Sequence, residues 1–236
     1  MRIKVIIPNV GMSRETLNER EVMLKRFARP DTEISVDCIS TGPESIESCY
    51  DEVLAGPEIV RRAVEAERQA FDAVVVYCFS DPAVEGAREL VSVPVIGPGE
   101  ASILSALALG QRFSIVTVLE ETIPRNVAHA HRLGVPPWRL ASVRSVGIPV
   151  SRLRDDLDQT YNMLLPVAKR CRDEDGAHVI VLAWVWQGWV NDCKMNWACQ
   201  LSIRHSLQLR GQNGWQHWAC ATASAPTRAP RKSCGY

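Results

Sequence analysis

Short apolar segments that alternate with helical patterns constrain the fold of this chain more than any other feature. Strands are expected near residues 3–7, 33–37, 73–77, 93–96, 113–118, 141–146 and 178–182. Helices are expected near residues 15–28, 57–70, 82–90, 99–109, 122–132 and 152–172. This alternation is typical of parallel sheets covered by helices. We therefore predict an α/β fold of two similar lobes, each a parallel sheet flanked by helices, with the active site in the cleft between them.

The charge balance limits the kinds of partner that the chain can bind. Lys plus Arg equals Asp plus Glu, at 27 of each, so no overall field favours nucleic acid or an anionic membrane. A small-molecule substrate is the expected partner, and the sequence leaves a homo-oligomer open. The first residues, "MRIKVIIPN", contain an apolar run too short for a signal peptide, and no apolar span of about 18 residues follows. We expect a cytoplasmic protein with no nucleic-acid or membrane partner.

The cysteine and histidine spacings do not indicate a metal site. The eight cysteines show no Cys-x-x-Cys or Cys/His spacing typical of zinc, and in a reducing compartment they would remain thiols. His129 and His131 are two residues apart on an expected helix, so they do not share a face and make a poor metal pair. Neither a disulfide nor a metal ion is expected.

The composition changes after Leu182. Residues 183–236 hold six of the seven Trp and only one acid, Asp192, whereas residues 1–182 hold 26 of the 27 acids. The end of the chain, "CATASAPTRAPRKSCGY", has neither a strand nor a helix period, so this tail is expected to be disordered. One interpretation is a basic, flexible tail that binds a partner or a membrane surface.

A shifted reading frame offers another interpretation of the same tail. The codons of Ala-Trp-Val-Trp-Gln-Gly-Trp, read from the third base of Ala183, encode Met, Leu or Val, then Gly, and lead into a sensible helix end and strand approach. In the shifted frame, the codon that precedes this reading ends in GC, the first two bases of the Ala183 codon, and so encodes Cys, Ser, Gly or Arg. Random frames seldom read so well, so we favour a frameshift as the origin of residues 183–236.

Function is expected in the loops that follow the strands, because ligands of parallel sheets bind beyond the carboxyl ends of the strands. These loops read "PNVG", "CFSDP", "GPGE" and "TVLEET". Cys78 lies in the second of them, before Asp81 and Pro82, which we interpret as an N-cap and a first-turn proline; a helix N-terminus favours a thiolate. The alternative is a buried structural thiol. Three other cysteines are expected to be packing residues: Cys38, Cys49 and Cys171.

The segments "VVVYCFSDPAVEGARE", "VPVIGPGEAS" and "FSIVTVLEETIPRN" resemble the aspartate/glutamate/hydantoin racemase superfamily, and hydantoin and allantoin racemases in particular. The resemblance implies a first racemase lobe over residues 1–98 and a second, incomplete lobe over residues 99–182, followed by the aberrant residues 183–236. It also implies a cofactor-independent enzyme in which each lobe places one cysteine at a strand end. The family's second cysteine lies in a Gly-Cys-x-Gly-Met motif, whereas the matching place here reads "LAWVWQGW".

Racemisation next to a carbonyl needs one group that removes a proton and another, on the opposite face, that delivers one, and thiols suit both roles. The resemblance makes Cys78 one of these groups. It also implies that substrate-binding residues lie on neighbouring loops: Pro8, Asn9, Ser80, Thr117 and Thr122.

The binding residues have alternative roles. Pro8 and Asn9 would present amide groups to a substrate carbonyl, although Asn9 is equally suited to closing a turn. The hydroxyls of the other three would hold the substrate's carbonyl or ring amides, and Thr122 is also a good N-cap for the following helix. Glu100 stands at a helix start, where an acid is favoured without any catalytic duty.

These features predict a racemase of 5-substituted hydantoins or of allantoin that works by two-thiol proton transfer, impaired here because the second thiol is absent. Two alternatives remain open. The chain could be a non-catalytic relative whose tail binds something else, or a decarboxylase or cis-trans isomerase of the same superfamily.

Overall fold

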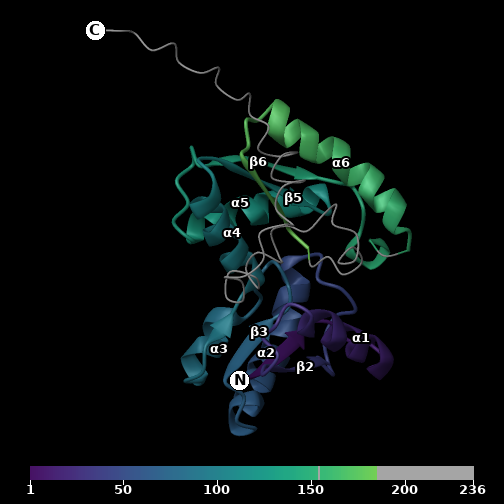
Figure 1. Ribbon diagram of the computed structural model, residues 1–236, viewed down its shortest axis with the longest axis vertical. Coiled ribbons are helices and arrows are strands. Elements are labelled where there is room, and N and C mark those ends of the chain that lie inside the picture. The colour runs from purple at the N-terminus through teal and green to yellow at the C-terminus, as the bar shows by residue number, and fades with distance from the viewer. Residues whose placement is uncertain (154, 185–236) are drawn as a thin grey trace.

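The computed structural model describes residues 1–153 and 155–184, and these residues form two lobes stacked along the long axis of the molecule (Figure 1). The elements of the first lobe are β1 (Arg2–Ile7), α1 (Arg14–Lys25), β2 (Glu33–Cys38), α2 (Cys49–Arg68), β3 (Ala73–Val76), α3 (Val84–Leu90) and β4 (Val95–Ile96). The elements of the second lobe are α4 (Pro98–Leu109), β5 (Phe113–Thr117), η1 (Glu120–Thr122), α5 (Ile123–Arg132), β6 (Leu140–Ser145), η2 (Val150–Arg152), α6 (Leu157–Asp173) and β7 (Val179–Leu182).

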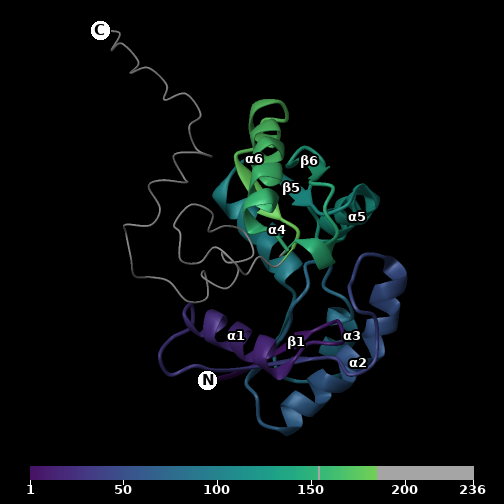
Figure 2. The same cartoon turned by 90° about the vertical axis from the view of Figure 1, so that its right-hand side faces the viewer.

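Each lobe contains one parallel sheet. The first sheet has the strand order β2-β1-β3-β4, and the second has the order β6-β5-β7. Helices cover both faces, with α1 opposite α2 and α3 in the first lobe and α5 opposite α6 in the second (Figure 2). Parallel pairing requires such crossover helices, which is why the sequence alternates. The predicted fold class, with two similar α/β lobes, is confirmed.

The central strands supply the core of each lobe. In the first lobe, Ile6 and Val74 are fully buried and belong to the same cluster as Ile59 of α2. In the second lobe, every residue of β5 is buried, and Val116 packs in one cluster with Leu164 of α6. Full burial of a Val, Leu or Ile side chain contributes about 1.5–3 kcal/mol, so these runs fix the positions of the strand ends that carry the site.

Helix α2 begins earlier than the expected range of 57–70. Ser48 and Asp51 form a capping box, in which Ser48 Oγ accepts a hydrogen bond from Asp51 N at 3.2 Å and Asp51 Oδ2 accepts one from Ser48 N at 2.8 Å. Pro57, where the expected range begins, lies inside the helix. The prediction was wrong because the reciprocal cap satisfies the free amides at the true start.

Other boundaries also differ from the expected ones. Helix α6 begins at Leu157 rather than near 152, because Asp156 caps it by accepting a hydrogen bond from Gln159 N at 2.9 Å. Residues 150–152 instead form the separate 3-10 turn η2. Strand β4 is limited to Val95–Ile96 within the expected 93–96.

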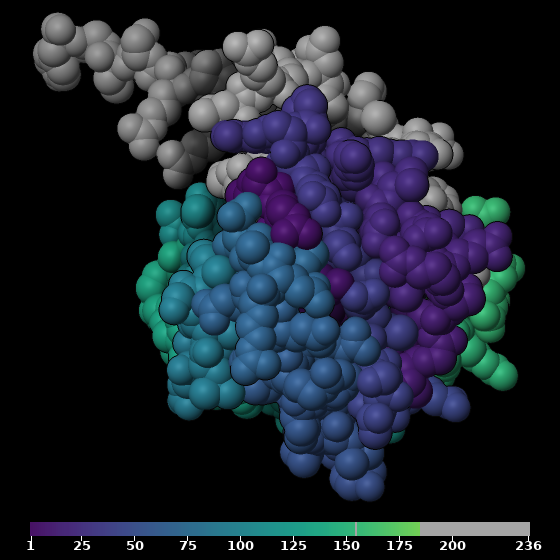
Figure 3. Space-filling model, turned by 90° about the horizontal axis from the view of Figure 1, so that it is seen from below, coloured from purple at the N-terminus to yellow at the C-terminus, as the bar shows by residue number. Residues whose placement is uncertain are grey.

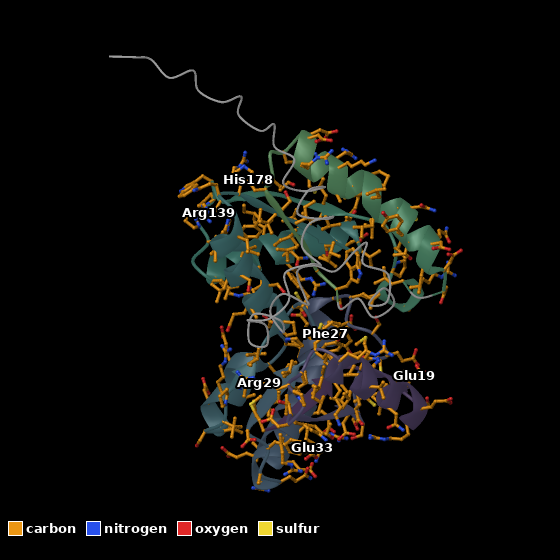
Figure 4. All side chains as sticks on the ribbon, in the orientation of Figure 1. Glu19, Phe27, Arg29, Glu33, Arg139 and His178 are labelled. Carbon is orange, nitrogen blue, oxygen red and sulfur yellow. The ribbon has the colours of Figure 1, made fainter. Side chains whose placement is uncertain are left out.

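The ends of the sheets away from the other lobe are closed by structural contacts. Arg139 and His178 lie at the far end of the second lobe (Figure 4). Arg139 Nη2 donates to Leu107 O at 2.6 Å and to Gly110 O at 2.8 Å, which satisfies carbonyls at the end of α4. The outer end of the first lobe is a continuous surface, seen in purple and blue in Figure 3.

The expectations about the tail are only partly within the described residues. Ala183 and Trp184 are described, and Trp184 is buried. Residues 185–236, for which we expect disorder and favour a frameshift, lie outside the described residues. Among the helices of the described residues, none is long and apolar enough to cross a membrane.

Candidate active site

A cavity of about 750 Å³ lies where the carboxyl ends of the strands of the two lobes meet. Its walls include residues that follow β1 and β3 in the first lobe, and β5 and β7 in the second. The residues predicted for the site all line it: Pro8, Asn9, Cys78, Ser80, Thr117 and Thr122. A cavity of this size suits a small molecule.

Cys78 follows β3 by two residues and is half-buried in the cavity wall. Its Sγ lies 3.4 Å from Ser80 Oγ. Burial raises the pKa of the Cys78 thiol to about 11, although the hydrogen bonds from Ser80 act in the opposite direction, and the negative charges of Asp81 and Glu52 raise it further. At neutral pH the resting form of Cys78 is therefore the protonated thiol.

The helix that we expected to begin at Asp81 and Pro82, beside Cys78, begins later in the chain. Helix α3 begins at Val84, and its N-cap is Ala83, which makes no side-chain cap hydrogen bond. Asp81 has a positive φ of 53° and does not cap this helix. The prediction that a helix N-terminus favours the Cys78 thiolate was wrong, because the chain makes a further turn between Cys78 and α3.

Asp81 instead caps α4. Its Oδ1 accepts a hydrogen bond from Gly99 N at 2.9 Å, and its Oδ2 accepts one from Glu100 N at 2.6 Å. A Cβ added at Gly97 would lie 2.3 Å from Asp81 Cγ, and one at Gly99 would lie 1.9 Å from Phe79 O. The two glycines of "GPGE" therefore leave room for this carboxylate, which ties the Cys78 loop to the start of α4.

His129 of α5 is buried and lines the cavity. Its Nε2 lies 3.3 Å from Asp81 Oδ2, and its ring centroid lies 6.1 Å from that of Phe79. His131 is exposed. Within residues 1–153 and 155–184, no group of three or more His, Cys, Asp or Glu side chains could hold a metal ion.

Glu100 is paired with Arg88 rather than turned to the cavity. Arg88 Nη1 and Nη2 donate to the two carboxylate oxygens at 2.9 and 2.8 Å. This bidentate bond holds the pKa of Glu100 below its usual value. The pairing is structural, as the position of Glu100 at a helix start suggested.

Thr117, Thr122 and Asn126 form a closed polar cluster on the second-lobe wall. The two threonine Oγ1 atoms lie 2.6 Å apart, and Thr122 Oγ1 donates to Leu119 O at 2.6 Å. Asn126 Nδ2 donates to Thr117 Oγ1 at 3.1 Å and to Thr122 O at 2.8 Å. Thr122 stands at the N-cap position of α5, as expected, but its side chain makes no cap hydrogen bond because its hydroxyl donates to Leu119 O.

Asn126 was not singled out from the sequence. The available signal was its spacing, since Asn126 follows Thr122 by four residues and therefore shares a face with it at the start of the expected helix. Only the pairing of β5 with the helix start reveals that Thr117 belongs to the same cluster.

Pro8 and Asn9 occupy the loop after β1. Pro8 is buried, and Val10 N donates to Pro43 O at 2.9 Å, which holds this loop against the segment before α2. Asn9 Nδ2 makes one long hydrogen bond to Val10 O, at 3.5 Å. The amide of Asn9 is thus held only weakly within the described part of the chain.

Polar contacts join the two lobes at the margin of the cavity. Arg125 of α5 donates to Glu52 Oε1 at 2.7 Å and to Glu47 O at 2.8 Å. Glu47 Oε1 also accepts a hydrogen bond from Val150 N at 3.0 Å. Arg125, Glu52 and Val150 line the cavity, whereas Glu47 does not. Together these hydrogen bonds hold the two lobes against each other.

Trp184 occupies the second-lobe position that Cys78 occupies in the first. Tyr77 N donates to Ile6 O at 2.7 Å after β3, and Ala183 N donates to Val116 O at 2.8 Å after β7. The next residue is Cys78 in one lobe and Trp184 in the other. Trp184 packs into the core of the second lobe and lines the cavity.

The described residues place no thiol of the second lobe in the cavity wall. Cys171 is buried in the core of the second lobe, and Cys38 is half-buried at the end of β2. Cys49 is exposed and lines the cavity from the first lobe, so the expectation that it packs in the interior was wrong. It stands at the first position of α2, where the helix turns its side chain outward.

Comparisons with known proteins identify relatives of this chain. A family model described as Asp/Glu/Hydantoin racemase matches residues 3–183. The chain belongs to this family. The hydantoin racemase of Pseudomonas sp. (strain NS671) is 34% identical over 184 residues, which cover 77% of this chain and 72% of that protein. The structure of allantoin racemase from Klebsiella pneumoniae is 33% identical and has a TM-score of 0.71 over 78% of this chain and 74% of that one.

The family membership confirms the resemblance seen in the sequence and identifies the relatives as racemases. The matched range includes every predicted site residue and ends next to Trp184. A structure of a Gly74Cys-Cys188Ser mutant of arylmalonate decarboxylase is 17% identical with a TM-score of 0.55, which shows a shared fold alone. This racemase-family chain thus combines a cavity between the lobes with a first-lobe thiol and a second-lobe indole.

Proposed function

We propose that this chain binds a 5-substituted hydantoin or an allantoin-type ring in the cavity between the lobes and exchanges its α-proton through Cys78 without a cofactor. The relatives named hydantoin racemase and allantoin racemase support the substrate class. The observation that carries the proposal is the position of Cys78, which stands beyond a buried strand, in the cavity wall and within the range that matches the family.

The proposed chemistry uses the thiolate of Cys78 as base. It removes the proton from C5 of the ring, and the electron pair of the C–H bond moves into the adjacent carbonyl to give an enolate. The thiol then returns a proton to C5, and the electron pair returns with it to form the new C–H bond. Since thiol protons exchange with water, the returned proton comes from solvent.

Inversion requires a proton donor on the opposite face, and Trp184 stands at the second-lobe position that corresponds to Cys78. An indole N–H is a hydrogen-bond donor but not an acid or base near neutral pH. We therefore propose that the described site exchanges the α-proton with retention of configuration, and that racemisation is strongly impaired.

The test is to incubate each enantiomer of a 5-substituted hydantoin with the full chain in D₂O. Deuterium at C5 is measured by NMR and configuration by optical rotation, with protein-free samples for the spontaneous rate. One enantiomer should gain deuterium and keep its rotation. Loss of rotation as fast as deuterium gain would reveal a second acid-base group, and no exchange of either enantiomer would reject Cys78 as the base.

A further inference from the structure

The orientation of the Asn126 amide is fixed by its partners. Asn126 is more than nine-tenths buried and lines the cavity. One of its amide hydrogens is directed to Thr122 O, a carbonyl that can only accept, at 2.8 Å. The side-chain nitrogen must therefore face the two threonines, and the side-chain oxygen cannot take its place.

The protons of the cluster are all committed. The second amide hydrogen of Asn126 goes to Thr117 Oγ1 at 3.1 Å, and the Thr122 hydroxyl donates to Leu119 O at 2.6 Å. Because the Thr122 proton is already used, the 2.6 Å contact between the threonine oxygens requires Thr117 to donate to Thr122. No donor of the cluster is left for a ligand.

The remaining polar atom of the cluster is Asn126 Oδ1. Among residues 1–153 and 155–184, nothing donates a hydrogen bond to Asn126 Oδ1. Asn126 Oδ1 is not among the fully buried atoms that lack a partner in the described residues, so it can be reached from the cavity, where a donor can complete its hydrogen bonding. This cluster can thus accept a hydrogen bond from a ligand but has no proton left to donate to one.

We propose that Asn126 Oδ1 accepts a hydrogen bond from a ring N–H of the substrate, the N1–H bonded directly to the reacting C5. This inference rests on the proposed function and names the edge of the ring that the second lobe recognises. An anchor on the atom next to C5 fixes both the position and the face that C5 presents, which a proton transfer needs.

The assignment changes the roles of the threonines. We expected Thr117 and Thr122 to hold the substrate's carbonyl or ring amides, but their hydroxyl protons are used within the cluster. They act as positioning residues, because they bind the amide nitrogen of Asn126 and leave its oxygen available to the cavity. The ring carbonyls would then find their donors on other parts of the wall.

The experiment compares two rings of the same shape. In a 5-substituted oxazolidine-2,4-dione, a ring oxygen replaces the N1–H of the hydantoin, while N3–H and both carbonyls are kept. Binding of both compounds to the full chain is measured by isothermal titration calorimetry. We expect the oxazolidinedione to bind about 10- to 100-fold more weakly, since an acceptor then faces an acceptor.

Variants identify the residue responsible. Asn126→Ala should reduce the preference for the hydantoin to less than about threefold, because the accepting oxygen is then gone. Asn162→Ala, on the exposed face of α6, is the matched control and should behave as the parent chain. Circular dichroism and thermal melts check that each variant folds.

The outcomes separate this inference from the proposed function. If neither ring binds, the proposed substrate class fails. If the hydantoin binds and the oxazolidinedione binds equally well to the parent chain, the substrate class stands and the role of Asn126 is rejected, without recourse to any variant. A preference that persists in Asn126→Ala also rejects it.

Discussion

The ends of β3 and β7 have the same backbone register but different chemistry. The residue that follows β3, Tyr77, donates a backbone hydrogen bond to β1, and the residue that follows β7, Ala183, donates the equivalent bond to β5. One position further along the chain stands Cys78 in the first lobe and Trp184 in the second. Equivalent scaffolds thus place a thiol and an indole at matching positions of one cavity. The fold specifies where a functional group stands, and the residue at that place decides what the site can do.

The two strand ends are also supported differently. The Cys78 loop is tied to α4 through Asp81, whose carboxylate fits against Gly97 and Gly99. The second-lobe wall is held by side-chain hydrogen bonds between β5 and the start of α5. The Cys78 loop is therefore positioned by a carboxylate for which two glycines leave space, whereas the second-lobe wall is positioned by a network of neutral side chains.

The largest expected effect comes from removing the thiol. Cys78→Ser should lower the rate of deuterium exchange at C5 by about a hundredfold to ten-thousandfold, because an alcohol is a far weaker acid than a thiol and supplies almost no ionised base. The rate is measured by NMR in D₂O. Cys38→Ser, at the end of β2 and outside the cavity, is the matched control; a similar loss in both variants would mean that the thiol chemistry is misplaced.

A second prediction removes the difference between the lobes. Trp184→Cys should restore a thiol opposite Cys78, so that optical rotation of the hydantoin is lost about a hundredfold faster than with the parent chain. Trp184→Ser is the control, since it opens the same space without a thiol. The substitution of a buried aromatic residue costs about 3–5 kcal/mol, so folding is checked by a thermal melt, and a folded variant that exchanges only with retention would contradict the symmetry argument.

The strand ends could be predicted from the sequence because local patterns define them. The runs before Cys78 and Thr117 are apolar and β-branched, and a polar loop follows each, so the strand limits and the loops of the site follow from composition and period. The rule that ligands bind beyond the carboxyl ends of parallel strands then brought distant loops together. Every predicted site residue lines the same cavity for this reason.

The contacts that sequence reasoning missed join residues that lie far apart in the sequence. Asp81 has the local pattern of an N-cap, yet its partners are the amides of Gly99 and Glu100, nineteen residues away at most. Arg125 pairs with Glu52 across 73 residues of sequence. Such pairings follow from how the two lobes approach each other, which no local period encodes.

A third prediction concerns the protonation of Cys78. Because burial raises its pKa to about 11, its thiolate fraction should rise about a hundredfold between pH 8 and pH 10, whereas an ordinary thiol of pKa near 8.5 rises only about fourfold. Alkylation by iodoacetamide, followed at Cys78 by peptide mass spectrometry, measures this rise. Because the pKa of Cys78 is higher in the folded state than in the unfolded state, the unfolded thiol ionises first as the pH rises. The folded state therefore loses stability above about pH 8.5.

A control and a contrary outcome define the test of that pKa. A synthetic peptide of residues 74–82 provides the unfolded reference under the same conditions. A labelling rate of Cys78 in the folded chain that levels off together with the peptide would show an ordinary thiol, and the proposed base would then be active at lower pH than the burial of Cys78 suggests.

The smallest expected effect concerns the support of the first strand end. Gly99→Ala would place a Cβ 1.9 Å from the backbone oxygen Phe79 O and 2.9 Å from Asp81 Oδ2, so the Cys78 loop and α4 must separate, at a cost of about 1–3 kcal/mol. The control is Gly56→Ala within α2, whose new Cβ would meet only Ala83 Cβ at 3.7 Å and which should be neutral or stabilising by up to about 1 kcal/mol. Thermal melts compare the two variants, with a loss of Tm expected for Gly99→Ala alone. Equal melting temperatures would mean that the loop beside Cys78 is as adaptable as the second-lobe wall, and that the Asp81 carboxylate does not fix the thiol in place.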